Sequence, residues 1–174
     1  HKALNMIRFK ISDRLDLFKG DEFARECDFE RILMDSLKSW TDEWVIDRQV
    51  EVGFGKCDLI IVKGNEQLAI ELKKSVATRK DIYQAVEYTK GNSGFDVAII
   101  AKKFPEDVIQ LANDLNVVCY EYLLGRYSGV SLYHCIYLER VNEPREPNDI
   151  ELELEEINRC DGHIIDYSIF PIPK

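Results

Sequence analysis

Residues 57–73, CDLIIVKGNEQLAIELK, contain two apolar runs separated by a Gly-Asn pair. Short runs rich in Ile, Leu and Val on either side of such a pair predict a β-hairpin. Side chains on a strand alternate between two faces, so Glu71 and Lys73 should project together from one face of the second strand. The comparable lengths of the two runs allow Asp58, which begins the first strand, to lie beside the end of the second. The stretch therefore predicts two carboxylates and one ammonium group at one end of a hairpin.

These three side chains indicate a site for a divalent cation. Two carboxylates that converge on one point repel each other, so they are costly to hold without a cation between them. Oxygen ligands suit a hard ion such as Mg²⁺, which binds one or two carboxylates and keeps several waters. We therefore expect Asp58 and Glu71 to hold Mg²⁺ or Mn²⁺, with Lys73 facing a metal-bound water and a phosphate.

The composition is that of one soluble globular domain. Of the 174 residues, 45% are apolar and 32% are charged; no apolar run approaches the roughly 20 residues that span a bilayer, and we expect no secretory signal. The five cysteines are odd in number and scattered, which favours reduced thiols in a cytoplasmic protein. A zinc site remains an alternative, although the paired ligand spacing of structural zinc modules is absent. Its candidate ligands are His134, Cys135, Cys160 and His163.

The net charge of −9 is unevenly distributed. Residues 142–174 hold nine acidic and three basic residues, a balance of −6, which leaves 23 acidic and 20 basic residues, or −3, in residues 1–141. We expect residues 1–141 to form the core domain and residues 142–174 an acidic extension packed on it. The overall charge argues against tight nonspecific DNA binding by this chain alone, so phosphate binding would depend on local clusters. The candidate cluster is Lys73, Lys74, Arg79, Lys80 and Lys90.

The segment before the hairpin predicts a helix. Asp21 is its expected N-cap and Trp40 its expected end, because apolar residues recur there at helical spacing. The stripe consists of Phe23, Cys27, Met34 and Leu37. Glu30 falls within this stripe, and an acid on the inward face of a helix needs a partner there.

Strands and helices alternate after the hairpin. Thr78 and Asp81 form a capping-box-like start of a second helix, on which Gln84 and Tyr88 share a face. The strand–helix–strand order of the next segments indicates a parallel crossover that completes a mixed sheet. The predicted strands are 44–52, 57–62, 67–73, 96–101 and 117–123; the predicted third helix is 105–115, and turns are expected at 53–56 and 63–66.

The two ends of the chain are less regular. Residues 4–18 alternate loosely, which indicates a strand, and residues 130–141 are apolar and β-branched enough for another. Pro144 and Pro147 mark a break. Residues 150–156, IELELEE, alternate as an edge strand with a charged outer face would. We expect this region to form an accessory layer on the main domain.

The order of these features resembles the PD-(D/E)XK nuclease superfamily over roughly residues 22–123. Asp58 matches the first acid of the motif, and Glu71 and Lys73 match its (D/E)XK pair. Glu30 matches the acid that many members contribute from the preceding helix. A lone Glu-x-Lys is a weak signal, because exposed ion pairs of this kind are common. The joint order of all these residues carries the resemblance.

Two further positions bear on the resemblance. Residues 84–88, QAVEY, resemble the QxxxY motif of the RecB-type branch, so Gln84 and Tyr88 would brace the site or touch the strand being cut. The proline in the superfamily's motif is replaced here by Cys57. That position shapes the entrance of the strand and is not a metal ligand, so the replacement leaves the ligand set intact.

The resemblance implies an α/β (α+β) fold with a central mixed β-sheet flanked by helices, as in restriction endonucleases. It also implies an Mg²⁺-dependent deoxyribonuclease. Asp58 and Glu71 would hold the metal together with the backbone carbonyl of Leu72, while Glu30 would help to hold a second ion or order a water. Lys73 would orient the nucleophile and contact a nonbridging oxygen. The implied partner is nucleic acid, most simply DNA, and the protein would act as a homodimer or within a larger complex.

Each of these residues also has an ordinary structural explanation. Glu30 could form a salt bridge at the edge of the core, Tyr88 could be a core aromatic, and Gln84 a surface amide. If Glu30 points away from the site, the replacement acids are Glu26, Asp28 and Asp47.

Two other functions remain open. The chain could be a catalytically silent nuclease-like module that binds nucleic acid or a protein within a restriction, repair or defence complex. It could also be an enzyme of another kind that uses Lys73 as a nucleophile, although no Gly-rich phosphate loop accompanies it.

Overall fold

The computed structural model describes residues 7–8, 17–40, 42–52, 55–89, 95–125 and 135–158. The strands are β1 (Ile7–Arg8), β2 (Phe18–Lys19), β3 (Glu22–Phe23), β4 (Val45–Val52), β5 (Gly55–Lys63), β6 (Glu66–Leu72), β7 (Asp96–Ala101), β8 (Val118–Gly125) and β9 (Cys135–Arg140). The helices are α1 (Glu26–Trp40), α2 (Arg79–Glu87), α3 (Glu106–Asp114) and α4 (Asp149–Asn158).

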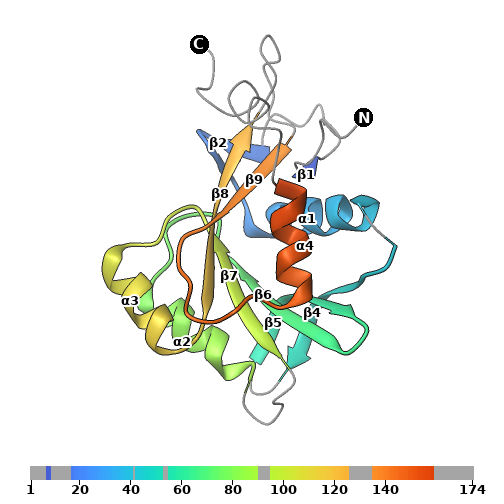
Figure 1. Cartoon of the computed structure of the whole chain (residues 1–174). Helices are drawn as coiled ribbons and strands as arrows, with labels where there is room; N and C mark the ends of the chain where they lie inside the picture. Colours follow the sequence, from blue (N-terminus) through green and yellow to red (C-terminus); the bar gives the residue numbers. More distant parts are fainter. Residues whose placement is uncertain are drawn as a thin grey trace.

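These described strands form one mixed sheet in the order β1-β9-β8-β7-β6-β5-β4, beside a separate β2–β3 hairpin. Helices cover both faces of the sheet (Figure 1). One face buries the side chains of α1 and α4, among them Leu33 and Leu154. The other buries those of α2 and α3, among them Ile82 and Val108. Each such aliphatic side chain contributes about 1.5–3 kcal/mol when fully buried. The predicted central mixed sheet flanked by helices is confirmed.

The hairpin that decides the fold is present. β5 and β6 pair antiparallel, and their turn closes between Lys63 and Glu66. Gly64 in that turn has φ +60°, a conformation that glycine adopts without steric cost. β6 then pairs parallel with β7, and β7 parallel with β8, so the predicted parallel crossover is also confirmed.

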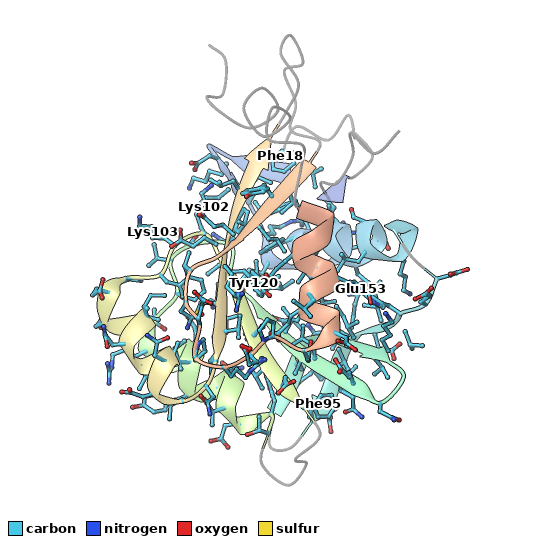
Figure 2. The ribbon with its side chains drawn as sticks, in the orientation of Figure 1. Phe18, Phe95, Lys102, Lys103, Tyr120 and Glu153 are labelled. Atoms are coloured by element: carbon cyan, nitrogen blue, oxygen red, sulfur yellow. The ribbon has the colours of Figure 1, made fainter. Side chains whose placement is uncertain are left out.

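The start of the first helix differs from the prediction. Asp21 is not its N-cap but lies in the turn between β2 and β3, where Phe18 pairs with Phe23. Gly20 allows this tight turn with φ +64°, and Lys102 lies beside the small hairpin (Figure 2), with its Nζ 3.5 Å from Asp21 Oδ2. The helix begins only at Glu26, because the pairing of Phe18 with Phe23 holds the preceding residues in a β-hairpin.

The buried stripe of α1 is correspondingly different. Phe29, Leu33 and Leu37, at successive i, i+4 positions, are the buried apolar residues of the helix. Of the stripe expected from the sequence, Phe23 and Leu37 are buried and Met34 packs against the core, whereas Cys27 is exposed. Glu30 is buried at the edge of this stripe, and it does meet a partner, described below.

The prediction of an edge strand at residues 150–156 was wrong, because this segment lies in the helix α4. Ile150 and Leu154, four residues apart, are both buried against the sheet. Asn148 caps the helix: its Oδ1 accepts a 2.9 Å hydrogen bond from the N–H of Glu151, whose Oε1 accepts one of 3.0 Å from the N–H of Asn148. This reciprocal capping box and the i, i+4 apolar pair outweigh the alternating pattern.

Several predictions fall partly or wholly outside the described residues. Of the expected strand at 4–18, the structure describes β1 and the start of β2, and of that at 130–141 it describes β9. Of the zinc candidates, His134, Cys160 and His163 lie outside. Along the described residues, no helix has the length and apolar character needed to cross a membrane.

Candidate active site

The β5–β6 register brings the two predicted acids together. Leu59 pairs with Ile70, and the next antiparallel position places Asp58 opposite Glu71. Ile70 and Leu72 bury their side chains on the face covered by α1 and α4. Because strand side chains alternate, Glu71 projects from the opposite face, toward α2.

Asp58 is held by two hydrogen bonds. Its Oδ2 accepts one of 2.8 Å from the backbone N–H of Leu72, and its Oδ1 accepts one of 3.1 Å from Nε2 of Gln49. The pKa of Asp58 is nevertheless raised, because burial and the charge of Glu30 outweigh these bonds. Each carboxylate oxygen retains a second lone pair, so both oxygens of Asp58 can still bind a cation.

Glu71 is almost fully buried, with 7% of its surface exposed. Burial, followed by the charge of Asp58, raises the pKa of Glu71 to about 8. Asp58 also lies within hydrogen-bonding reach of the Glu71 carboxyl group. Two carboxylates in such contact do not both ionise at neutral pH unless a cation joins them. The pair is therefore a site where a divalent cation would displace a proton.

Tyr88, just after α2, supports Glu71 from the other side. Its hydroxyl lies 2.6 Å from Glu71 Oε1 and 3.0 Å from the backbone carbonyl of Lys56. A hydroxyl has one proton, so it donates to one of these oxygens at a time. Burial and Glu71 raise the pKa of Tyr88, which keeps the hydroxyl protonated. The Tyr88 ring packs so closely on Gly55 that a Cβ there would lie 2.8 Å from Cε1.

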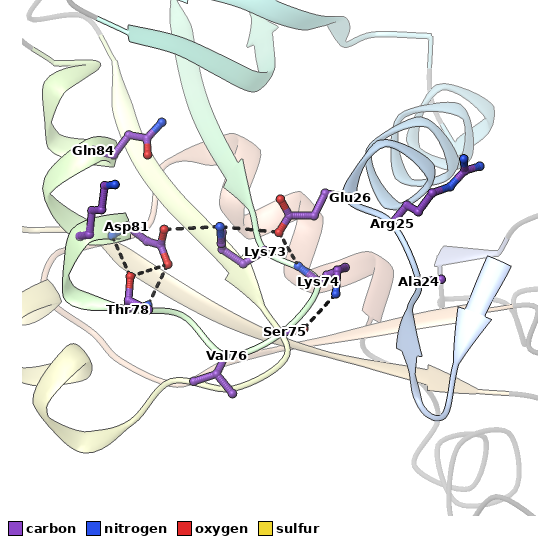
Figure 3. Close-up of a pocket in the computed structure, with 11 residues that line it drawn as sticks. Ala24, Arg25, Glu26, Lys73, Lys74, Ser75, Val76, Thr78, Asp81 and Gln84 are labelled. Atoms are coloured by element: carbon purple, nitrogen blue, oxygen red, sulfur yellow. Dashed lines mark hydrogen bonds and ion pairs between the residues drawn. The ribbon is translucent and has the colours of Figure 1, made fainter. Parts of the chain in front are cut away.

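Lys73 follows the last residue of β6 and is partly buried. Its Nζ lies 3.7 Å from Glu26 Oε2 and 3.5 Å from Asp81 Oδ1, as the dashed lines of Figure 3 show. Burial alone would lower the pKa of Lys73, but Asp81 and Glu26 outweigh it and raise the pKa above its usual value. A lysine nucleophile needs a lowered pKa, so these contacts disfavour the alternative in which Lys73 is the nucleophile.

Glu30 forms a salt bridge with Arg48. Its Oε1 accepts a 2.7 Å hydrogen bond from Arg48 Nε, and its Oε2 accepts one of 2.8 Å from Gln49 Nε2. The ordinary explanation, a salt bridge at the edge of the core, therefore applies to Glu30. Its carboxylate nonetheless lies close enough to raise the pKa of Asp58, so it contributes charge to the site.

Gln49 is a site residue that the sequence did not reveal. The β4–β5 register places it opposite Asp58, and its φ of +52° is unusual for a residue other than glycine. This backbone turns the amide so that one nitrogen donates to both Glu30 and Asp58. A glutamine in an alternating strand has no sequence signature of such a conformation. Only the positive φ, known from the structure, marks it.

The remaining predicted residues lie at different distances from the acid pair. Gln84 is exposed and lines a neighbouring pocket, without a hydrogen bond to the acids. Of the replacement acids, Glu26 contacts Lys73, Asp28 is buried between two arginines of its own chain segment, and Asp47 is exposed. The structure thus brings together Asp58, Glu71, Lys73 and Tyr88. Glu30 is joined to Asp58 by the two hydrogen bonds of Gln49.

The donor set fits a hard divalent cation that keeps several waters. The described residues contain no group of three or more His, Cys, Asp or Glu side chains arranged to hold a metal, so side-chain ligands would number two. The N–H of Leu72 points at Asp58, and within a strand the carbonyl of the same residue faces the same neighbour. Two carboxylates and one carbonyl match the way Mg²⁺ is bound in proteins.

A pocket of about 730 Å³ adjoins this site beyond Lys73. It lies between the amino-terminal end of α1 and α2, and the segment after β6 forms its floor (Figure 3). It is lined by Ala24, Arg25, Glu26, Lys73, Lys74, Ser75, Val76, Thr78, Lys80, Asp81 and Gln84.

No family model and no curated protein matches the chain. Three solved structures are similar to part of it. A repair endonuclease from Pyrococcus abyssi has a TM-score of 0.48 and 13% identity, over 56% of this chain and 46% of its own. The EndoMS–dsDNA complex has a TM-score of 0.46 and 15% identity, over 63% and 47%. Pyrococcus furiosus SfsA in complex with Ca²⁺ has a TM-score of 0.40 and 13% identity, over 66% of this chain and 61% of its own.

The matched region spans about half of each of the two endonuclease chains.

Proposed function

We propose that this protein is a metal-dependent nuclease of the PD-(D/E)XK type that hydrolyses phosphodiester bonds in DNA. The observation that carries the proposal is the contact between Asp58 and Glu71, two partly or fully buried carboxyl groups. No described basic side chain forms an ion pair with either acid. Burial of like charges without a counter-ion is unfavourable, so the pair is best explained as a cation site.

The proposed metal is Mg²⁺ or Mn²⁺, held by Asp58, Glu71 and the Leu72 carbonyl. When bound, such an ion would lower the pKa of a water and offset the charge that develops on the phosphate. Tyr88 fixes the orientation of the Glu71 carboxylate through its hydroxyl. Gln49 does the same for Asp58 and keeps Glu30 at a fixed separation from it.

Lys73 supplies the positive charge on the substrate side. Its ammonium group is held by Glu26 and Asp81, and its raised pKa keeps it charged at neutral pH. A charged ammonium beside the acid pair can donate hydrogen bonds to a nonbridging phosphate oxygen and to the attacking water. Its role is electrostatic and positional.

Cleavage assays test the proposal. Plasmid and single-stranded DNA are incubated with the protein and Mg²⁺, Mn²⁺ or EDTA, and Glu71→Ala and Lys73→Ala are compared with the exposed control variants Glu139→Ala and Lys38→Ala. Cutting should require the metal and should be lost in the two site variants only. Cutting that continues in EDTA, or in Glu71→Ala, would refute the assignment.

One observation favours the catalytically silent module as a second candidate. Glu30, the acid expected to help with a second ion, already has a cationic partner, because Arg48 forms a salt bridge with it at 2.7 Å. A silent module would bind DNA or a protein partner without gaining thermal stability from Mn²⁺. An active nuclease should gain it, because a ligand that binds only the folded state stabilises that state.

We also propose that the protein works in the cytoplasm with reduced thiols. Cys57 and Cys119 are buried and free, and Cys27 is exposed and free. Burial raises the pKa of the Cys57 and Cys119 thiols, which makes them poor nucleophiles. A homodimer would let two active sites cut both strands of a duplex. The solution mass with and without a short duplex tests this.

A further inference from the structure

The pocket beside Lys73 carries positive charge on an otherwise acidic chain. Four basic and two acidic side chains line it, a balance of +2, whereas the whole chain carries −9. The two acids, Glu26 and Asp81, are both engaged by Lys73. The pocket is therefore the place near the acid pair where an anion would be attracted locally.

Two of the lining cations have no acidic partner among the described residues. Lys74 Nζ has only a 3.4 Å contact with Ser75 Oγ, and Lys80 is exposed on α2. They come from two different walls of the pocket, since Lys74 follows β6 on the α1 side (Figure 3) and Lys80 belongs to α2. Both ammonium groups line the same pocket, so an anion bound there can contact each of them.

The pocket is open to solvent rather than a closed cavity. Lys73, which shares a strand face with Glu71 of the acid pair, lines it together with the uncharged side chains of Val76 and Gln84. Val76 is 49% exposed and can contact the apolar part of a sugar. A small inorganic anion would use only part of a hollow of about 730 Å³, whereas a nucleotide segment would fill more of it.

We propose that this pocket is a backbone subsite that holds the phosphodiester chain next to the bond being cut, with Lys74 and Lys80 contacting its phosphates. The inference rests on the proposed function, since the strand reaches the acid pair past Lys73. The ligand class is the sugar-phosphate backbone of the cut DNA strand. The subsite binds the DNA strand and orients it toward the acid pair, where the bond is cut.

The test measures binding separately from cutting. Fluorescence anisotropy of a labelled single-stranded oligodeoxynucleotide is recorded in EDTA over a series of NaCl concentrations. The variant is Lys74→Gln with Lys80→Gln, and the matched control is Lys19→Gln with Lys38→Gln, which removes the same charge from two exposed lysines outside the pocket. Thermal melting of both verifies that they fold.

Loss of two phosphate contacts should lower the slope of log K against log[salt] by about 1.4 for a single strand and weaken binding by about tenfold at low salt. The control should keep a slope close to that of the wild type. Under Mg²⁺, the pocket variant should show a raised KM and a kcat close to that of the wild type. Inorganic phosphate should compete only weakly.

Other outcomes overturn the subsite. Equal slopes and affinities for the two double variants would show that the pocket does not contact the strand, and strong competition by inorganic phosphate would show a site for a free anion. Both results leave metal-dependent cutting intact and so spare the proposed function. Absence of cutting by the wild type, with a pocket-dependent binding difference, would refute the nuclease and retain the subsite.

Discussion

Two buried glutamates of this protein have opposite surroundings. Glu151 on α4 has no exposed surface and receives two hydrogen bonds from Arg145, of 2.7 and 2.9 Å. Glu71 on β6 is nearly as buried, but the charge of another acid, Asp58, acts on it more strongly than that of Lys73. The first carboxylate is bonded directly to a cation, whereas no described basic side chain forms an ion pair with the second.

The difference separates a structural acid from a candidate functional one. Arg145 also donates to the carbonyl of Val97, so the Glu151 pair ties the segment after β9 to β7 and α4. Burial alone would lower the pKa of Arg145, but Glu151 outweighs it and raises the pKa. At Glu71, by contrast, burial raises the pKa of the acid itself. A buried acid whose pKa is raised by burial and by a second acid is typical of functional sites.

The largest expected effect on stability is at Glu151. Glu151→Ala leaves the partly buried Arg145 guanidinium with only Asp96, at 3.9 Å, as an acidic neighbour, which should cost about 3 kcal/mol of unfolding free energy. Urea denaturation measures this loss. Glu153→Ala on the same helix removes a partly exposed carboxylate paired with Lys63 and should cost no more than about 1 kcal/mol. Equal losses of unfolding free energy in the two variants would show that Glu151 is no more important for stability than Glu153.

The pH dependence of stability should reveal the uncompensated acid pair. The folded-state pKa of Glu71, about 8, lies above its ordinary value of 4.5, so its contribution to stability is fully present below about pH 4.5 and is lost as the pH rises through about 8. In EDTA, the unfolding free energy should fall over this range by the order of a few kcal/mol. Glu71→Gln should flatten this fall, and denaturant midpoints at several pH values measure it. An unchanged slope in the variant would contradict the prediction.

Metal should reverse that loss. At ten times its dissociation constant, Mn²⁺ should stabilise the folded protein by about 1.4 kcal/mol, and the gain should grow as the pH rises because the cation displaces a proton from the Asp58–Glu71 pair. Thermal melting with and without Mn²⁺ measures the shift. Glu71→Gln should show no shift, whereas Glu151→Gln, if folded, should keep it.

The smallest effect is expected at Gln49. Gln49→Gly keeps the positive φ without steric cost but removes the amide that joins Glu30 to Asp58. Residues that orient metal ligands typically change metal affinity by about 10–100-fold, so Mn²⁺ binding should weaken by about tenfold while stability changes little. Isothermal titration with Mn²⁺ tests this. Gln49→Ala, which keeps the strained backbone, should lose both affinity and stability.

The sequence predicted the proximity of the three side chains because its determinants are local. Asp58, Glu71 and Lys73 lie in one hairpin, whose turn and alternation fix their faces. The capping of α2 by Thr78 and Asp81 was also correct, because a capping box involves residues only three positions apart.

One error came from following one local pattern where another prevailed, and the other came from a contact between residues distant in sequence. The alternation of residues 150–156 favoured a strand, but Asn148 begins a helix whose Glu151 pairs with Arg145. Asp21 had the chemistry of an N-cap, but aromatic packing of Phe23 on Tyr122 and Phe29 places it in a hairpin turn. Such packing depends on residues far along the chain, which a reading of neighbours does not detect.

The close approach of Gly55 to the Tyr88 ring has an evolutionary consequence. These two positions are 33 residues apart in sequence (88 − 55), yet a methyl group at the first would overlap the ring at the second. Homologues that carry a larger residue at the first position should therefore have lost the aromatic ring at the second, and with it the hydroxyl that reaches Glu71. Substitutions at the two positions should consequently be correlated across a lineage, and proteins that have changed both should be those that no longer depend on this acid.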